Sequence, residues 1–126
     1  MAAVLIIDDS RFQRGVIRRA VEAAGHEALE AADGHAGLER SVAVAPDVVL
    51  MDLVMPGIDG MELLGLFRER GFTAPVVVLT SDVQDSTRAR CLDLGAAAFV
   101  NKPVQEVELR AVIDDVLGLA AQRIEG

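Results

Sequence analysis

The chain has 126 residues, 52% hydrophobic and 25% charged, with a formal net charge of −8 at pH 7. This length fits one domain with a single core, and the acidic balance argues against direct binding of a nucleic-acid backbone, which requires a basic patch. The single cysteine, Cys91, excludes an internal disulfide and every Cys-x-x-Cys metal or redox motif. A small buried hydrophobe on a helix is favoured for Cys91 over a reactive thiol.

No segment of the sequence has the pattern of a membrane span or a secretion signal. The N-terminal apolar run lacks a basic flank and is followed by two aspartates. No apolar stretch reaches the ~18 residues that a spanning helix needs. We therefore expect a cytoplasmic protein without a membrane partner.

Apolar runs of strand length alternate with segments of helical period along the chain. In chain order, the pattern predicts strands at residues 3–7, 28–32, 48–51, 76–79 and 97–100. Four of these runs are apolar on both faces, so helices are expected to cover both sides of the sheet. The run at residues 28–32 is the weakest of the five.

Amphipathic helices are predicted between and after these strands, one of them at residues 35–44. Two apolar stripes at helical spacing are expected to face the core. The first helix contributes Phe12, Val16, Ala20 and Ala23. The last helix contributes Leu109, Val112, Ile113, Val116, Leu117 and Ala120. The alternation predicts a single α/β domain built on a five-stranded parallel sheet with helices on both faces.

Polar side chains follow four of the five predicted strands. In a parallel sheet, ligands bind beyond the carboxyl ends of the strands, where the strand order reverses. The residues at these ends are Asp8 and Asp9, Asp52, Thr80 and Ser81, and Asn101 and Lys102. Each has an ordinary explanation as a helix cap or a turn residue when it is taken alone. Four independent strand ends with complementary chemistry predict a shared site instead.

Several of these residues have alternatives that the sequence leaves open. Ser10 followed by Gln13 already forms a capping box, which leaves Asp8 and Asp9 free for other roles. Thr80 and its neighbours either cap the fourth helix or supply a functional hydroxyl. Of the 12 basic residues, only Lys102 is a lysine, which indicates a site that needs a compact point charge.

Together these motifs resemble the receiver domain of bacterial two-component response regulators, close to the stand-alone chemotaxis type. The matching segments are LIIDDS at residues 5–10, VVLMDLVMPGIDG at 48–60, VVVLTS at 76–81 and GAAAFVNKP at 95–103. The resemblance covers the whole chain and implies one receiver domain over residues 1–126. It also implies a flavodoxin-like fold with five helices and the strand order 2-1-3-4-5. No effector domain is expected within these residues.

The resemblance implies phosphoacceptor chemistry that depends on Mg²⁺. Asp52 would take a phosphoryl group from a histidine kinase or a phosphotransfer protein and become an acyl phosphate. Clustered carboxylates repel such a group, so a dication with a preference for oxygen ligands is required. The implied metal ligands are Asp8, partly through water, together with Asp9, Asp52 and the backbone carbonyl of Val54. Lys102 would contact a phosphoryl oxygen, and Thr80 would donate a hydrogen bond.

A conformational switch is implied by the same resemblance. Thr80 would move toward the phosphoryl group, and Phe99 would turn inward into the vacated space. The signal would reach a downstream protein on the face built from the fourth helix, fifth strand and fifth helix. The alternative for Phe99 is a permanent core residue, because phenylalanine has no hydroxyl that prefers water. The resemblance further implies a cis peptide bond between Lys102 and Pro103, and a monomer or weak homodimer.

Other classes of function fit the sequence less well. A flavin-binding flavodoxin needs a phosphate-binding loop after the first strand, where this chain has two anions. An aspartyl phosphatase would carry a second acid at the position of Val54. Neither glycine pattern of the nucleotide-binding enzymes is present. A receiver-like scaffold that is never phosphorylated remains the alternative, and no enzymatic activity is expected beyond the domain's own phosphorylation and dephosphorylation.

Overall fold

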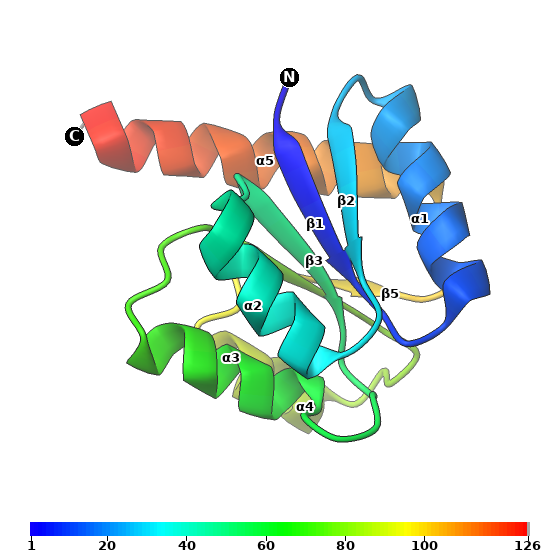
Figure 1. Ribbon diagram of the computed structural model, residues 1–126, viewed down its shortest axis with the longest axis vertical. Helices are drawn as coiled ribbons and strands as arrows, with labels where there is room; N and C mark the ends of the chain where they lie inside the picture. Colours follow the sequence, from blue (N-terminus) through cyan, green and yellow to red (C-terminus); the bar gives the residue numbers. More distant parts are fainter. Residues whose placement is uncertain (126) are drawn as a thin grey trace.

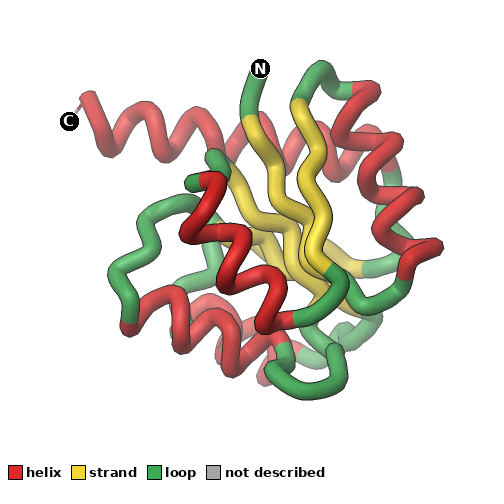
Figure 2. The backbone as a smooth tube through the Cα atoms, viewed as in Figure 1, coloured by secondary structure: helices red, strands yellow, loops and turns green. Residues whose placement is uncertain are grey.

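The computed structural model describes residues 1–125, and the side chains of residues 1–118. Within this part of the chain, strands and helices alternate in the following order: β1 (Ala3–Ile7), α1 (Arg11–Ala23), β2 (Glu27–Ala31), α2 (Gly34–Val44), β3 (Val48–Asp52), α3 (Gly60–Glu69), β4 (Val76–Thr80), α4 (Asp85–Asp93), β5 (Ala98–Asn101) and α5 (Glu106–Glu125). Figures 1 and 2 show one central sheet between two layers of helices.

The sheet has the strand order β2-β1-β3-β4-β5, and all of its neighbouring strands are parallel. This confirms the predicted five-stranded flavodoxin-like fold. β1 lies between β2 and β3, so the chain reverses its direction of travel across the sheet after β2. Both β3 and β4 run one residue further than predicted. Asp52 and Thr80 are therefore the last residues of strands, which places them more rigidly than loop residues.

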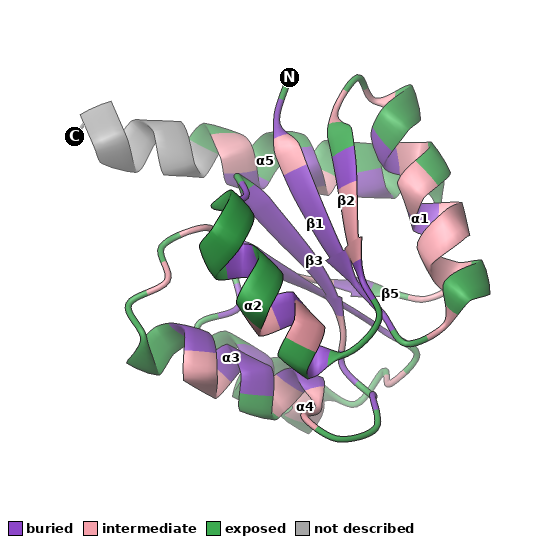
Figure 3. Ribbon diagram, in the orientation of Figure 1, coloured by how far each residue is buried: buried purple, intermediate pink, exposed green. Residues whose placement is uncertain are grey.

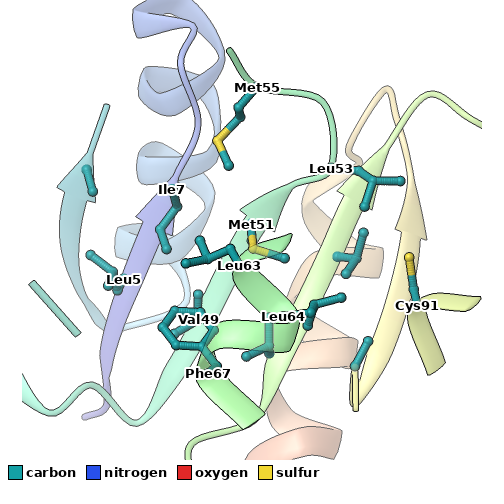
Figure 4. Packing of buried hydrophobic residues seen from close by; sticks show 14 residues of the cluster. Leu5, Ile7, Val49, Met51, Leu53, Met55, Leu63, Leu64, Phe67 and Cys91 are labelled. Carbon is teal, nitrogen blue, oxygen red and sulfur yellow. The ribbon is translucent and has the colours of Figure 1, made fainter. Parts of the chain in front are cut away.

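Two hydrophobic cores form because successive side chains of a strand point to opposite faces of the sheet. Along β1, Leu5 and Ile7 enter one cluster, which continues into α2, α3 and α4. Val4 and Ile6 enter the other, which continues into α1 and α5. Figure 4 shows the first cluster from close by, and Figure 3 shows that the central strands are almost entirely buried.

The predicted core stripe of α1 is wrong for Phe12 and Ala23, whereas Ala20 does pack against the core. Phe12 is 73% exposed and Ala23 is also exposed, while Val16 and Ala20 are half-buried. The side chains that α1 buries are Ile17 and Val21. Both stripes have helical spacing, and packing against the sheet selects the one with the larger β-branched side chains.

The predicted stripe of α5 is confirmed for the residues whose side chains are described. Leu109, Ile113 and Val116 are buried, and Val112 and Leu117 pack beside them. Ala120 lies outside the described side chains. Within the described part of the chain, no helix is long and apolar enough to cross a lipid bilayer.

Candidate functional site

Three carboxylates meet at the carboxyl ends of β1 and β3. These strands are neighbours, with Ile7 opposite Met51, so the residues that follow them lie side by side. One carboxylate oxygen from each of Asp8, Asp9 and Asp52 lies within 4.8 Å of the others. Asp8 is buried, Asp52 is half-buried and Asp9 is exposed, so the cluster opens to solvent on the side of Asp9.

Lys102 brings the positive charge to this cluster from the far side of β4. Its Nζ lies 3.1 Å from Asp8 Oδ2 and 3.5 Å from Asp52 Oδ2, and its side chain is 12% exposed. The backbone N–H of Lys102 donates to the carbonyl of Thr80 at 2.8 Å, which continues the pairing of β5 with β4. The Lys102–Pro103 peptide bond is cis, the isomer that the sequence led us to expect.

Burial raises the pKa of Asp52, and the nearby Asp8 carboxylate raises it further, while the Lys102 ammonium and the Val54 N–H act in the opposite direction. One ammonium faces three carboxylates, so the cluster carries excess negative charge. Oxygen donors held at one open edge suit a hard dication, which takes carboxylate ligands and keeps several waters. The donor set therefore fits Mg²⁺ better than a metal that requires nitrogen or sulfur ligands.

Asp8 is held in place by its own loop and by β2. Its Oδ1 accepts a hydrogen bond from the Ser10 N–H at 2.8 Å, and its N–H donates to the carbonyl of Ala31 at 3.2 Å. Ser10 also caps α1, since its side chain accepts from the Gln13 N–H at 3.2 Å. This is the N-cap half of the predicted capping box; the reciprocal bond to the Gln13 side chain is replaced by the bond from the Ser10 N–H to Asp8. Ser10 is the N-cap of α1, so neither aspartate is needed in that role.

The loop after β3 adds Val54 to the edge of the site. The Val54 N–H donates to Asp52 Oδ1 at 3.4 Å, and the Val54 side chain is exposed. Further along, Gly60 packs so closely against this loop that a Cβ on it would lie 2.7 Å from Leu53 Cα and 2.8 Å from the Asp52 carbonyl oxygen. Only glycine fits there, which ties the start of α3 to the strand end that carries Asp52.

Thr80 is buried at the end of β4, and its hydroxyl accepts a hydrogen bond from the Asp82 N–H at 3.1 Å. The Asp82 carboxylate accepts two hydrogen bonds, from the Gln84 N–H and from Thr87 Oγ1, both at 2.9 Å. The N-cap of α4 is Gln84, which makes no side-chain capping bond. None of residues 80–82 is therefore the N-cap, although Asp82 braces the first turn of the helix.

Phe99 lies on β5 opposite Val78 and is half-buried. Its ring packs against the cluster that underlies α2, α3 and α4. Asn101, at the end of the same strand, donates from Nδ2 to the Asp82 carbonyl at 3.3 Å. The strand therefore connects the loop beside Thr80 to the packing around Phe99, and the switching roles of both residues stay predictions.

Sequence reasoning missed Arg14 of α1, which contacts the backbone of the site rather than its carboxylates. Its Nη1 donates to the backbone carbonyl of Asp8 at 2.6 Å, and its side chain is 14% exposed. Arg14 stands three and seven residues before Ile17 and Val21, which the structure shows to be buried, so its spacing indicates an inward position once that stripe is identified. An arginine in the inward stripe of a helix needs a polar partner inside the fold.

Comparison with known proteins assigns the family. The model of the response regulator receiver domain matches residues 4–114. The chain belongs to this family. The receiver domain is similar to chemotaxis protein CheY of Halobacterium salinarum, with 34% identity over 114 residues that cover 90% of this chain and 95% of that protein. Protein PilH of Pseudomonas aeruginosa is 34% identical over 119 residues, which cover 93% and 98% of the two chains.

Other relatives are much longer than this receiver domain. Protein-glutamate methylesterase/protein-glutamine glutaminase of Treponema pallidum is 37% identical over 116 residues, which cover 87% of this chain and 29% of that protein. The chain likewise spans 28% of the Treponema denticola relative of the same name.

Among solved structures, chemotaxis protein CheY4 of Vibrio cholerae has a TM-score of 0.86 at 28% identity, covering 92% of this chain and 98% of that one. The sequence, the fold and these relatives together make the chain a phosphoacceptor signalling domain of two-component systems.

Proposed function

We propose that residues 1–126 act as one receiver domain in which Asp52 accepts a phosphoryl group in the presence of Mg²⁺. The observation that carries this proposal is the convergence of Asp8, Asp9 and Asp52 within 4.8 Å, with the Lys102 ammonium 3.5 Å from Asp52. The arrangement supplies a nucleophilic carboxylate, ligands for a dication and a fixed cation for the transferred group.

The chemical step is a displacement at phosphorus. A carboxylate oxygen of Asp52 forms a bond to the phosphorus of a phosphohistidine, and the phosphorus–nitrogen bond of the donor breaks. The electron pair of that bond leaves with the imidazole nitrogen, which takes up a proton. Lys102 would bind a phosphoryl oxygen as a point charge, and Thr80 would donate a hydrogen bond to another after it leaves the Asp82 N–H.

Mg²⁺ would be held by Asp8, Asp9, Asp52 and the backbone carbonyl of Val54. When bound, it would offset the negative charge of the carboxylates and of the phosphoryl group. Asp8 would act partly through water, since it is already engaged by Lys102 at 3.1 Å. The exposed position of Asp9 leaves room for the waters that Mg²⁺ retains.

The proposed donor is a histidine kinase or a phosphotransfer protein, and the proposed output is a downstream protein that binds the α4-β5-α5 face. Thr80 and Phe99 would connect the site to that face through β4 and β5. We propose a monomer or weak homodimer that makes no direct contact with nucleic acid and catalyses only its own phosphorylation and dephosphorylation. A cytoplasmic location stays a prediction from family membership.

Intact-protein mass spectrometry after incubation with acetyl phosphate tests this proposal. We expect a mass gain of one phosphoryl group that requires Mg²⁺ and is absent in Asp52→Asn. Asp114→Asn is the matched control, because Asp114 is exposed on α5 and the substitution removes the same charge; it should be modified like the wild type. Equal modification of the wild type and Asp52→Asn would reject Asp52 as the acceptor.

A further inference from the structure

Arg14 joins the loop of the carboxylate cluster to the edge strand of the sheet. Its Nη1 donates to the Asp8 carbonyl at 2.6 Å, while its Nε donates to Glu30 Oε1 on β2 at 3.2 Å. The side chain is 14% exposed and lies on the inward side of α1. A planar guanidinium suits this task, because its donors are fixed in one plane and can bind two partners at once.

Glu30 is the anchor that holds Arg14. It also accepts a hydrogen bond from Arg18 Nη1 at 2.5 Å, so two arginines of α1 share one carboxylate of β2. The hydrogen bond from Arg18 lowers the pKa of Glu30, and that from Arg14 adds to the effect. Glu30 is therefore charged at neutral pH and keeps its hold on both guanidinium groups.

The atom that Arg14 contacts belongs to the peptide unit between the two acidic residues. That unit is planar, so fixing the Asp8 oxygen also fixes the direction toward the nitrogen and Cα of Asp9. Asp8 is already held through its N–H by Ala31 and through its carboxylate by Ser10. Asp9 is exposed, and its position depends on the orientation of this plane.

We propose that Arg14, anchored by Glu30, is a positioning residue that sets the peptide plane between Asp8 and Asp9 and thereby the spacing of the two carboxylates for a divalent cation. This inference rests on the proposed Mg²⁺ site. The competing explanation is that Arg14 only contributes positive charge near the cluster. The two explanations predict opposite signs, because losing a nearby positive charge should strengthen the binding of a cation, whereas losing a support should weaken it.

Isothermal titration calorimetry with Mg²⁺ distinguishes the two explanations. For Arg14→Gln we expect the dissociation constant to rise about tenfold, the lower end of the effect of losing a supporting partner of a metal ligand. Arg14→Lys keeps the charge but cannot span both partners, so it should restore only part of the affinity. Unchanged or tighter binding in Arg14→Gln would overturn the inference.

Arg19→Gln is the charge-matched control. Arg19 lies on the same helix, is exposed and donates to the Gly15 carbonyl at 3.2 Å, so its loss changes the charge without touching the loop. Its Mg²⁺ affinity should equal or slightly exceed that of the wild type. If Arg19→Gln weakened binding as much as Arg14→Gln, the effect would not be positional and the inference would fail.

Two further measurements separate positioning from a general loss of structure. Glu30→Ala leaves Arg14 in place but removes the carboxylate that anchors it, and should weaken Mg²⁺ binding by a smaller factor; unchanged affinity would contradict the proposal, even if Arg14→Gln failed to fold. With acetyl phosphate, Arg14→Gln should need more Mg²⁺ for half-maximal phosphorylation but keep its rate at saturating Mg²⁺ within about twofold. A large fall in that rate would contradict a positioning role.

The wild type separates failure of this inference from failure of the proposed function. If the wild type binds no Mg²⁺, and Asp9→Ala behaves like it, the metal site itself is refuted. If the wild type binds Mg²⁺ and Asp9→Ala loses it, the site is sound and the result for Arg14→Gln decides the inference alone.

Discussion

Asp52 carries a charge that the fold only partly compensates. Burial and the neighbouring Asp8 both raise the pKa of its carboxyl group, and Lys102 opposes them from 3.5 Å. Lys102 is shared, since its shorter contact is the 3.1 Å one to Asp8. The ionised Asp52 carboxylate is thus held in the folded protein at a cost in stability.

The pH dependence of stability should expose this cost. The pKa of Asp52 is raised on folding, so its ionisation destabilises the folded protein. This destabilisation is absent at a pH below the pKa of Asp52 in the unfolded chain and grows as the pH rises through the folded-state pKa. In metal-free buffer, Asp52→Asn should therefore be more stable than the wild type at pH 7, by on the order of 1 kcal/mol. The difference should vanish near the acidic end, where both side chains are neutral. Urea unfolding at several pH values measures it.

Saturating Mg²⁺ provides the internal check on this pH experiment. A ligand that binds only the folded state stabilises it by mass action. Mg²⁺ should therefore stabilise the wild type, and the difference in unfolding free energy that favours Asp52→Asn should become smaller or change sign. If Asp52→Asn were the less stable protein at pH 7 without metal, the burial of Asp52 would not be costly, and this account would be wrong.

At the scale of elements, the start of α3 sets the position of the loop that follows β3. Asp59 caps the helix by accepting from the Glu62 N–H at 2.9 Å. The Gly60 N–H donates to the Leu53 carbonyl at 2.8 Å. The absence of a side chain at Gly60 lets the helix approach the backbone that carries Asp52.

Two glycines of α3 should respond to alanine with opposite signs. In Gly60→Ala the new Cβ would meet backbone atoms of Asp52 and Leu53 at 2.7–2.9 Å, which should cost about 1–3 kcal/mol of unfolding free energy and slow phosphorylation. In Gly65→Ala nothing lies within 4 Å of the new Cβ, so the better helix propensity of alanine should stabilise by about 0.5–1 kcal/mol. Denaturant unfolding measures both; equal effects would show that the contact at Gly60 is unimportant.

The elements and the site differ in how far the sequence could predict them. Strand positions were predicted to within one residue. Four of the five strands are apolar on both faces, a pattern with few alternatives, and β2, with Glu27 and Glu30, is the exception. The buried side of α1 was not predicted correctly. Residues 12–23 contain two overlapping apolar patterns, and only packing against the sheet determines which of them is buried. Arg14 was missed because its role also depends on a tertiary contact: its partner Glu30 lies on a different element.

At the scale of the whole molecule, stability is distributed unevenly. β1, β3 and β4 are almost wholly buried between the two cores. α4, by contrast, buries only Cys91 among its nine residues and has no side-chain N-cap bond. Burial raises the pKa of the Cys91 thiol, as the expected structural role implies. Segments with few buried contacts open first, and here such a segment belongs to the face proposed for output.

Amide hydrogen exchange across the chain should show this gradient. We expect the slowest amides in β1, β3 and β4, and clearly faster exchange in α4. Thr87→Val should speed exchange in Asp85–Asp93 further by an amount equivalent to about 1 kcal/mol, because it removes the hydrogen bond to Asp82 Oδ2. Thr87→Ser keeps the hydroxyl and should exchange like the wild type. Protection in α4 equal to that of the central strands would refute this distribution.

The single lysine allows the carboxylate cluster to be probed by selective chemical modification. Lys102 is the only lysine among the 126 residues. Within these residues, amine-directed acylating reagents therefore have one lysine side chain to modify, and it lies between the carboxylates of Asp8 and Asp52. Lys102 is 12% exposed, so the yield of its modification reports how open that site is. For the same reason, acetylation of a lysine side chain within these residues would remove the positive charge that lies 3.5 Å from Asp52.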